Sequence, residues 1–308
     1  MKLLRQNQVD VEVQRIAVVG TFDGVHRGHR FLLDFMMSQA QQRYLEPSVI
    51  TFSQHPLTVI RPHNVPKQLT TIDERISMLQ ECGVESCIML DFDDELRRQS
   101  ARQFLEMILS DYGVKVLVIG FNTRFGSDCI DSFEEYEKLG NEVGIEVIQA
   151  PEYGSGICSS AIRNMLKNSK ISEVNDALGY CYSIVGKVVK GKQLGRTIGF
   201  PTANIEVNDD KKLIPATGVY VVNVNIPHLD KTYRGMLNIG RRPTVDIANA
   251  PISIEVHIID FGGDIYGKEV SVKFIKHIRE ERPFPSLDAL IEQLTLDRQE
   301  AMKNIELC

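Results

Sequence analysis

Residues 16–29 read IAVVGTFDGVHRGH, an apolar run followed by a glycine-containing turn and two histidines. The apolar residues 16–20 favour a buried strand, and residues 29–42 carry apolar side chains at helical spacing. His26 and His29 are three residues apart, so they lie on the same side of a helical turn. The stretch therefore predicts a strand, a tight turn and a helix, with two imidazoles where the strand leads into the helix.

The remainder of the first half alternates in the same way. Further apolar runs predict buried strands, and the segments between them have helical spacing. The strands are expected at 48–52, 87–90 and 116–120, and the helices at 73–82, 96–109 and 132–142. Such alternation indicates a doubly wound α/β domain, in which helices cover both faces of a parallel sheet. Ligands in these sheets lie beyond the carboxyl ends of the strands, where the two histidines are expected.

The second half is rich in β-forming residues, divided by Gly, Pro, Asn and Asp. Its clearest strands, at 220–224, 235–239 and 252–258, predict an antiparallel β-barrel or sandwich. A C-terminal helix is expected after the N-cap residue Ser286, with an apolar face. That face is formed by Leu287, Leu290, Ile291 and Leu294. A helical stretch precedes the change of pattern, so we expect two domains, 1–179 and 180–308.

Composition restricts the class of protein. The 308 residues are 43% hydrophobic and 25% charged, which is ordinary for a soluble globular chain. No apolar run approaches the roughly 20 residues that span a bilayer, and the start of the chain does not resemble a secretory signal. The net charge is −6 without any block of five basic residues, and the six cysteines lack zinc-site spacing. We expect a cytoplasmic protein without membrane or nucleic-acid partners.

The turn before the first long helix has the features of a phosphate site. Gly28 between the two histidines lets a phosphate approach the backbone, and a helix start offers unpaired N–H groups to an anion. Imidazoles placed there can donate hydrogen bonds to charge that develops on an attacked α-phosphate. The alternative is an ordinary turn with two surface histidines. The position of the two histidines directly after the first strand favours the phosphate site.

These residues resemble the HxGH nucleotidyltransferases and, within them, the bacterial bifunctional riboflavin kinase/FMN adenylyltransferase (FAD synthetase) family. Three further segments agree: FSQHP at 52–56, GFNTRFG at 120–126 and ICSSAIR at 157–163. The resemblance implies that His26 and His29 are catalytic and that Asn122 lies on the flavin or nucleotide side. It also implies a set of residues around ATP and its phosphates. They are Gly20, Phe22, Gly28, Ser159, Ser160 and Arg163.

Each of these residues has a simpler interpretation. Ser159 or Ser160 can cap the helix that follows, which is compatible with phosphate binding at the same helix start. Arg163 can be a solvated surface residue, and Asn122 can be a turn residue. Residues 127–129, Ser-Asp-Cys, depart from the family, which has basic and glycine residues after the phenylalanine and glycine.

Residues 195–204, GRTIGFPTAN, resemble the Pro-Thr-Ala-Asn motif of flavokinases. The resemblance implies that Thr202 and Asn204 help to place Mg²⁺ and ATP, and their oxygens are reasonable ligands for a hard cation. The alternative is a turn led by proline. Upstream, GKVVKGKQ at 186–193 nearly spells a P-loop, but it lacks the final Ser or Thr and a following helix pattern. We expect a flap over phosphates instead, containing Gly191 and Lys192.

Glu255 lies in a run of alternating apolar residues, and a carboxylate in a strand can accept the proton of an attacking alcohol. By resemblance it matches the catalytic base, and Arg279 is a weaker candidate for substrate contact. An exposed strand residue is the alternative for Glu255. The resemblance implies that the protein phosphorylates riboflavin to FMN and adenylylates FMN to FAD, with ATP and Mg²⁺. Two alternatives are a flavin-sensing regulator and a nucleotidyltransferase for another phosphorylated acceptor.

Overall fold

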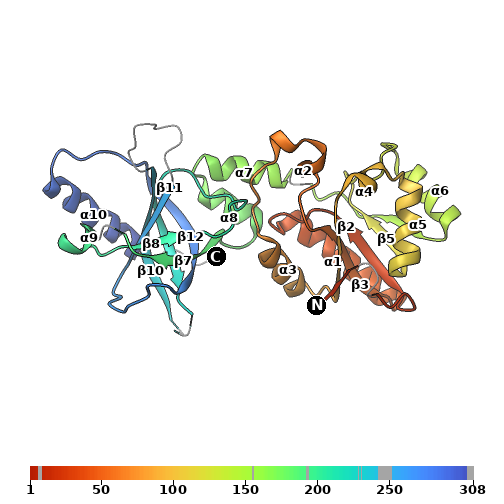
Figure 1. The fold of residues 1–308 in the computed structure, drawn as a ribbon, viewed down its shortest axis with the longest axis horizontal. Helices are drawn as coiled ribbons and strands as arrows, with labels where there is room; N and C mark the ends of the chain where they lie inside the picture. The colour runs from red at the N-terminus through yellow and green to blue at the C-terminus, as the bar shows by residue number, and fades with distance from the viewer. Residues whose placement is uncertain are drawn as a thin grey trace. The chain divides into compact units, whose positions relative to one another are not determined.

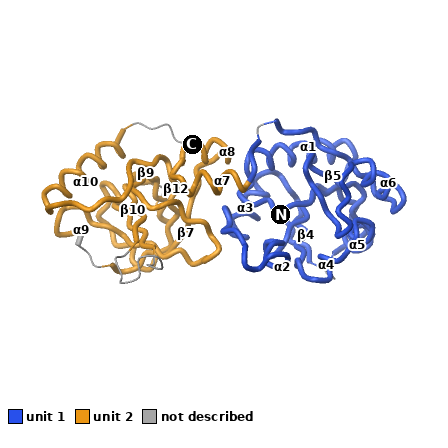
Figure 2. The backbone as a smooth tube through the Cα atoms, turned by 90° about the horizontal axis from the view of Figure 1, so that it is seen from above, with its two compact units in different colours: residues 1–158 blue, residues 159–308 orange. Residues whose placement is uncertain are grey.

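The computed structural model describes residues 1–5, 9–154, 156–191, 194–227, 229, 231–241 and 252–303. The chain forms two compact units, residues 1–158 and residues 159–308 (Figure 2). The helices over residues 159–178 therefore group with the second unit, although the sequence pattern suggests a boundary at 179/180. Where the chain divides into independently folding parts stays a prediction.

The first unit is built on a six-stranded parallel sheet (Figure 1). Its strands are β1 (Lys2–Leu4), β2 (Arg15–Val19), β3 (Glu46–Phe52), β4 (Ser86–Leu90), β5 (Val114–Ile119) and β6 (Glu146–Gln149). They lie in the order β1-β4-β3-β2-β5-β6, and all neighbours are parallel. The strand order reverses at β2, which has β3 on one side and β5 on the other. In doubly wound sheets the ligand crevice opens at this reversal, at the carboxyl ends of the strands.

Helices cover both faces of this sheet, which confirms the doubly wound architecture. They are α1 (Arg27–Arg43), α2 (Leu57–Ile60), α3 (Ile72–Glu81), α4 (Asp94–Arg98), α5 (Ala101–Tyr112) and α6 (Phe133–Val143), with a 3₁₀ turn η1 (Pro62–Asn64). Helices α1 and α3 pack on one face through Leu33 and Leu79. Helices α5 and α6 pack on the other through Ile108 and Tyr136.

The prediction of one helix over 96–109 was wrong, because two helices, α4 and α5, occupy that region. Ser100 Oγ accepts a hydrogen bond from Gln103 N, and the Gln103 side chain accepts one from Ser100 N. This reciprocal capping box begins a new helix at the next residue. The short strands β1 and β6 did not give a recognisable pattern in the sequence.

The second unit is a closed antiparallel barrel, which confirms the β-barrel prediction. Its strands are β7 (Ser183–Val189), β8 (Ala203–Glu206), β9 (Gly218–Asn225), β10 (Thr232–Arg241), β11 (Ile252–Ile258) and β12 (Glu269–Arg279). They close in the order β10-β11-β8-β7-β12-β9, with β9 pairing back to β10. Among its described residues, the helices that accompany the barrel are α7 (Ser159–Lys167), α8 (Ile171–Leu178), α9 (Leu194–Thr197) and α10 (Leu287–Met302). Closure removes the unpaired strand edges.

Helix α8 is fastened to this barrel by one buried amide side chain. Asn175 Nδ2 donates to the Phe274 carbonyl in β12 over 2.9 Å, and Asn175 Oδ1 accepts from Tyr182 N over 2.8 Å. The side chain therefore satisfies backbone groups of β12 and of the residue that precedes β7. It is one of several contacts that join residues 159–178 to the barrel, another being the 3.3 Å hydrogen bond between Ser169 Oγ and Tyr220 Oη.

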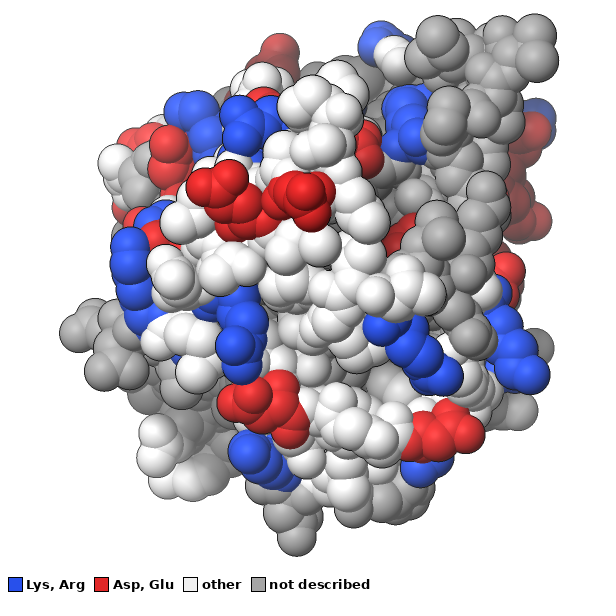
Figure 3. Space-filling model, turned by 90° about the vertical axis from the view of Figure 1, so that its left-hand side faces the viewer, with Lys and Arg blue, Asp and Glu red and all other residues white. Residues whose placement is uncertain are grey.

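Surface charge is mixed. The face shown in Figure 3 carries acidic and basic side chains around a largely uncharged middle, and neither sign forms a continuous patch among its described residues. With a net charge of −6, an anionic substrate has to be held by groups within its own site. Among the described helices, none is both long enough and apolar enough to span a bilayer.

Candidate active sites

The turn after β2 has an unusual backbone. Phe22 and Val25 have φ of +48° and +33°, in the left-handed region that favours glycine, and Gly24 has φ of +84°. Phe22 and Val25 are fully buried. Left-handed conformations of such residues persist only where surrounding structure holds them, and they cluster at functional sites. The turn is thus held by packing and places the start of α1 at the carboxyl end of β2.

A buried carboxylate fastens this turn to the segment before α3. Asp23 accepts hydrogen bonds from Leu69 N over 2.8 Å and from Thr70 N over 3.0 Å. Thr70 Oγ1 accepts in turn from Gly24 N over 3.1 Å. Asp23 does not stand out in the sequence as a site residue, because Asp in a glycine-containing turn is common.

The two histidines lie face to face at the start of α1. His26 is the N-cap residue, and its Nδ1 accepts from His29 N over 3.3 Å. The ring centroids are 3.7 Å apart, with an interplanar angle of 15°. Because Nδ1 of His26 is an acceptor, the proton of its neutral ring lies on Nε2. A Cβ at Gly28 would lie 3.3 Å from the His26 ring, so glycine leaves the space that this stacking needs.

His29 combines a partly exposed side chain with a buried ring nitrogen. Its Nδ1 is buried and has no hydrogen-bond partner among the described residues, although the side chain as a whole is partly exposed. Burial lowers the pKa of His29 well below its usual range, and the charges of His26 and Arg75 lower it further. An incoming phosphate would supply negative charge and favour the protonated form. Phe22 packs 5.2 Å from the His29 ring, so its side chain supports the histidine from the buried side.

Arg75 of α3 lies buried beneath the turn, at 5% exposure. Its Nη1 donates to the Thr21 carbonyl over 2.8 Å and to Thr51 Oγ1 over 3.3 Å. Burial lowers the pKa of Arg75, and the charge of Asp23 opposes that shift. Arg75 is not among the site residues predicted from the sequence. The sequence does place a charged residue on the apolar face of this helix, between Ile72 and Leu79, and that position indicates a buried charge.

A cavity of about 760 Å³ opens beside this turn, at the reversal of strand order. Its walls are aromatic and basic, with backbone of residues 20–21 at the end of β2. They include the side chains of Phe52, Phe92, Phe104, Phe125, Arg97, Arg98 and Arg124, together with one carboxylate, Asp94. Phe52 and Phe92 meet edge to face, with centroids 5.4 Å apart. Aromatic walls with planar cations fit a flat aromatic ligand that carries an anionic group.

The predicted residue Asn122 is exposed on the loop after β5, and its neighbours Thr123 and Arg124 line the cavity. The atypical residues 127–129 follow on the same loop. Asp128 accepts from Ala101 N over 2.9 and 3.1 Å, which fastens the loop to the start of α5. In this chain the carboxylate of Asp128 therefore has a positioning role.

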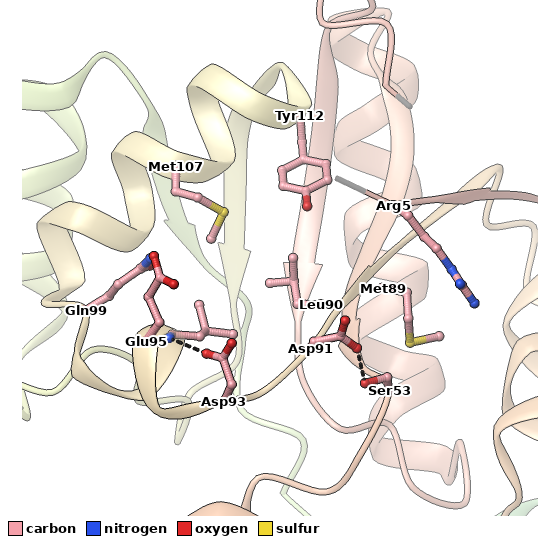
Figure 4. A pocket seen from close by; sticks show the side chains of 11 residues that line it. Arg5, Ser53, Met89, Leu90, Asp91, Asp93, Glu95, Gln99, Met107 and Tyr112 are labelled. Carbon is pink, nitrogen blue, oxygen red and sulfur yellow. Dashed lines mark hydrogen bonds between the residues drawn. The ribbon is translucent and has the colours of Figure 1, made fainter. Parts of the chain in front are cut away.

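A second cavity of the first unit, about 470 Å³, is lined by carboxylates and by Arg5 (Figure 4). Asp91 accepts from Ser53 Oγ over 2.5 Å, and Asp93 caps α4 by accepting from Leu96 N over 2.8 Å. Glu95 adds a third carboxylate to the lining. Like charges repel, so a cavity lined by several carboxylates is the less suited of the two to a phosphate group.

Ser159, Ser160 and Arg163 lie on α7, which begins at Ser159. Both hydroxyls therefore lie in the first turn of a helix, and their contact with ATP phosphates stays a prediction. These residues belong to the second unit and the histidines to the first. Their joint contact with one nucleotide stays a prediction.

The predicted kinase residues meet in the barrel. Glu255 of β11 pairs with Asn204 of β8, and Thr202 Oγ1 donates to Glu255 Oε2 over 3.3 Å. A Cβ at Gly191 would lie 2.2 Å from Asn204 Nδ2, so only glycine lets the backbone pass this closely. Lys192 lies outside the described residues. The hydroxyl of Thr202 and the amide oxygen of Asn204 form a donor set suited to a hard divalent cation.

Two cavities of the barrel meet at Thr202, which lines both. One, about 330 Å³, contains Glu255 together with apolar and aromatic walls. Those walls include Phe200, Met236, Phe284, Leu290 and Leu294, and Arg279 also lines this cavity. The other, about 310 Å³, is lined by Arg196, residues 261–266 and the start of β8. A nucleotide in the second cavity and an alcohol in the first would meet at Thr202 and Glu255.

Comparisons with known proteins agree with the division of the chain into two units. The FAD synthetase family model matches residues 9–161 and the riboflavin kinase family model matches residues 178–305. The bifunctional riboflavin kinase/FMN adenylyltransferase of Escherichia coli is 36% identical over 286 residues, which are 92% of this chain and 90% of that protein. Its counterpart in Bacillus subtilis is 32% identical over 296 residues, with 95% and 93% covered.

A solved structure from Streptococcus pneumoniae, described as a macrolide-efflux protein, shares the fold. Its TM-score is 0.87 at 32% identity, and the match covers 98% of this chain and 99% of that one. The unit with the paired histidines is the part that the FAD synthetase model matches, and the barrel with Glu255 lies in the part that the riboflavin kinase model matches. By its two domains in this order and its identity over most of its length, the chain belongs to the family of bifunctional riboflavin kinase/FMN adenylyltransferases.

Proposed function

We propose that the barrel phosphorylates riboflavin in a site that contains Thr202 and Glu255. The first unit then adenylylates the resulting FMN in a site that contains the paired histidines. Both reactions belong to the family and use ATP. The observation that carries the residue assignment is the position of Thr202. It lines both barrel cavities and donates to the carboxylate of Glu255 over 3.3 Å.

In the kinase reaction, riboflavin occupies the cavity with aromatic and apolar walls, and ATP occupies the cavity that contains Arg196. Glu255 accepts the proton of the ribityl hydroxyl as its oxygen attacks the γ-phosphorus, and ADP leaves. Thr202 orients the carboxylate through its hydrogen bond. Mg²⁺, when bound, neutralises charge on the phosphate oxygens. Thr202 and Asn204 would hold it together with ATP oxygens and water.

In the adenylyltransferase reaction, FMN occupies the aromatic cavity beside the turn after β2. A phosphate oxygen of FMN attacks the α-phosphorus of ATP, and pyrophosphate leaves. The reaction needs positioning and charge stabilisation without a covalent enzyme intermediate. His26 can donate from Nε2 to an oxygen of the α-phosphate, and His29 gains a partner for its buried nitrogen. We also infer a cytoplasmic location, since both reactions consume ATP.

The direct test is incubation of purified protein with riboflavin, ATP and MgCl₂, followed by chromatography of the flavins. FMN and FAD should both accumulate, and FMN supplied directly should give FAD. Binding of flavins without any product would favour a sensor that has lost turnover. Adenylylation of other phosphorylated compounds in preference to FMN would refute the assignment of the aromatic cavity to flavin.

A further inference from the structure

We infer that Asp297 is a positioning residue for riboflavin, which acts by holding Arg279 against Phe284 at the wall of the kinase cavity. The inference rests on the proposed function of that cavity. Asp297 lies on α10 and is only 1% exposed, although most neighbouring positions of this helix are partly or fully exposed. A buried carboxylate on such a helix needs partners, and it has several.

The carboxylate of Asp297 accepts hydrogen bonds from the side chains of Arg279 and Gln293. Arg279 donates to it from Nη2 over 2.8 Å and from Nε over 3.1 and 3.2 Å. Gln293 Nε2 donates to it over 2.8 Å. Bidentate contacts of this kind fix the direction of a guanidinium. A buried ion pair is seldom a net source of stability, so the geometry it imposes is the better account of its presence.

The guanidinium that Asp297 holds faces an aromatic ring. Arg279 Cζ lies 5.5 Å from the centroid of Phe284, and Arg282 Cζ lies 5.4 Å from the same centroid. Arg282 Nη2 donates to Gln293 Oε1 over 2.6 Å, which returns the chain of contacts to α10. The contacts thus link the end of β12, the following loop and α10 around Phe284.

This network borders the proposed riboflavin cavity. Arg279, Arg282 and Phe284 all line the cavity that contains Glu255. A second ion pair, Lys276 to Glu300 over 2.8 Å, also joins β12 to α10, but neither of its residues lines the cavity. The two bridges connect the same strand and helix, and only one of them reaches the wall that a flavin would contact. The chain therefore offers a matched control.

The test uses the full-length protein with Asp297→Asn, which keeps the shape and removes the charge. The KM for riboflavin should rise by about tenfold, the size of one charge-assisted hydrogen bond. The kcat at saturating riboflavin should stay within about threefold, because the hydrogen bonds of the described residues do not join Asp297 to Glu255 or Thr202. Formation of FAD from supplied FMN should not change. An unchanged KM for riboflavin would overturn the inference.

The control is Glu300→Gln, which breaks the bridge away from the cavity. It should leave the KM for riboflavin unchanged, and thermal unfolding of both variants shows whether α10 has loosened. An equal rise in KM in both variants would show a general effect of helix attachment and would overturn the positioning role. Glu255→Gln separates the two proposals. If it retains full turnover, the kinase site itself is misassigned; if it is inactive and Asp297→Asn has a normal KM, only the role of Asp297 fails.

Asp297→Asn removes the countercharge of Arg279, whose side chain is only 18% exposed, and this loss can prevent folding. The double variant Arg279→Met/Asp297→Leu removes both charges and leaves neither unpaired. It should fold and show the same rise in KM for riboflavin. A normal KM in that variant would overturn the inference equally.

Discussion

Replacement of Glu255 by Gln removes a proton acceptor from the barrel site while the shape of the site stays in place. Gln has the same number of heavy atoms, and its side-chain carbonyl can accept the hydrogen bond that Thr202 Oγ1 donates over 3.3 Å. The pairing opposite Asn204 belongs to the backbone of β8 and β11 and does not depend on the carboxylate. The substitution therefore tests proton transfer and not folding.

The two interpretations of Glu255 predict effects of different size. If Glu255 only accepts a hydrogen bond from Thr202, its replacement weakens one bond by about 1–1.5 kcal/mol, which is about tenfold in rate. General-base assistance supplies ~10²–10⁴-fold. We expect kcat for FMN formation to fall by at least about 100-fold, while the affinities for riboflavin and ATP change by less than about threefold.

The assay measures FMN formation by chromatography and riboflavin affinity by titration of flavin fluorescence. Formation of FAD from supplied FMN is the internal control, because His26 and His29 belong to the other unit. The affinity titration is needed because a variant that cannot bind riboflavin would imitate one that cannot react. A folded Glu255→Gln protein with kcat within about tenfold of the original would refute the assignment of the base.

Three further predictions concern the first unit and the boundary between the units. His29→Ala should abolish FAD formation and leave FMN formation nearly intact; loss of both in a folded protein would contradict the division of labour. Arg75→Met removes the donor that lies 2.8 Å from the carbonyl of Thr21, so adenylylation should slow. The free energy of unfolding of the first unit should fall by about 2 kcal/mol, and by less in Arg75→Lys. Denaturant titration and FAD assays check this, and original values in both would refute it. Fragments 159–308 and 180–308 should both phosphorylate riboflavin. The longer fragment, which alone contains Asn175, should have the higher midpoint of thermal unfolding by calorimetry. Equal midpoints would show that this amide adds no stability.

The sequence by itself determined the fold class of each unit and led to the prediction of where the phosphate chemistry takes place. Apolar spacing and helix capping act over a few residues, so the strand at β2, the helix at α1 and the HxGH spacing between them can be read locally. The same reasoning explains the one helix that was misread. Ser100 and Gln103 form a capping box that was already visible as a local pattern, and it divides the predicted helix over 96–109.

Only the tertiary structure decided which charged side chains are buried and what they hold. Arg75 reaches a carbonyl 54 residues away in the chain, and Asp297 is paired with an arginine 18 residues away. Leu290 and Leu294 form part of an apolar helix face that a sequence alone would assign to a core, yet they line the kinase cavity. The physical reason is that a local pattern records only the polarity of a position. The partners of a buried charged side chain come from distant segments, which lie together only once the sheet has assembled and the barrel has closed.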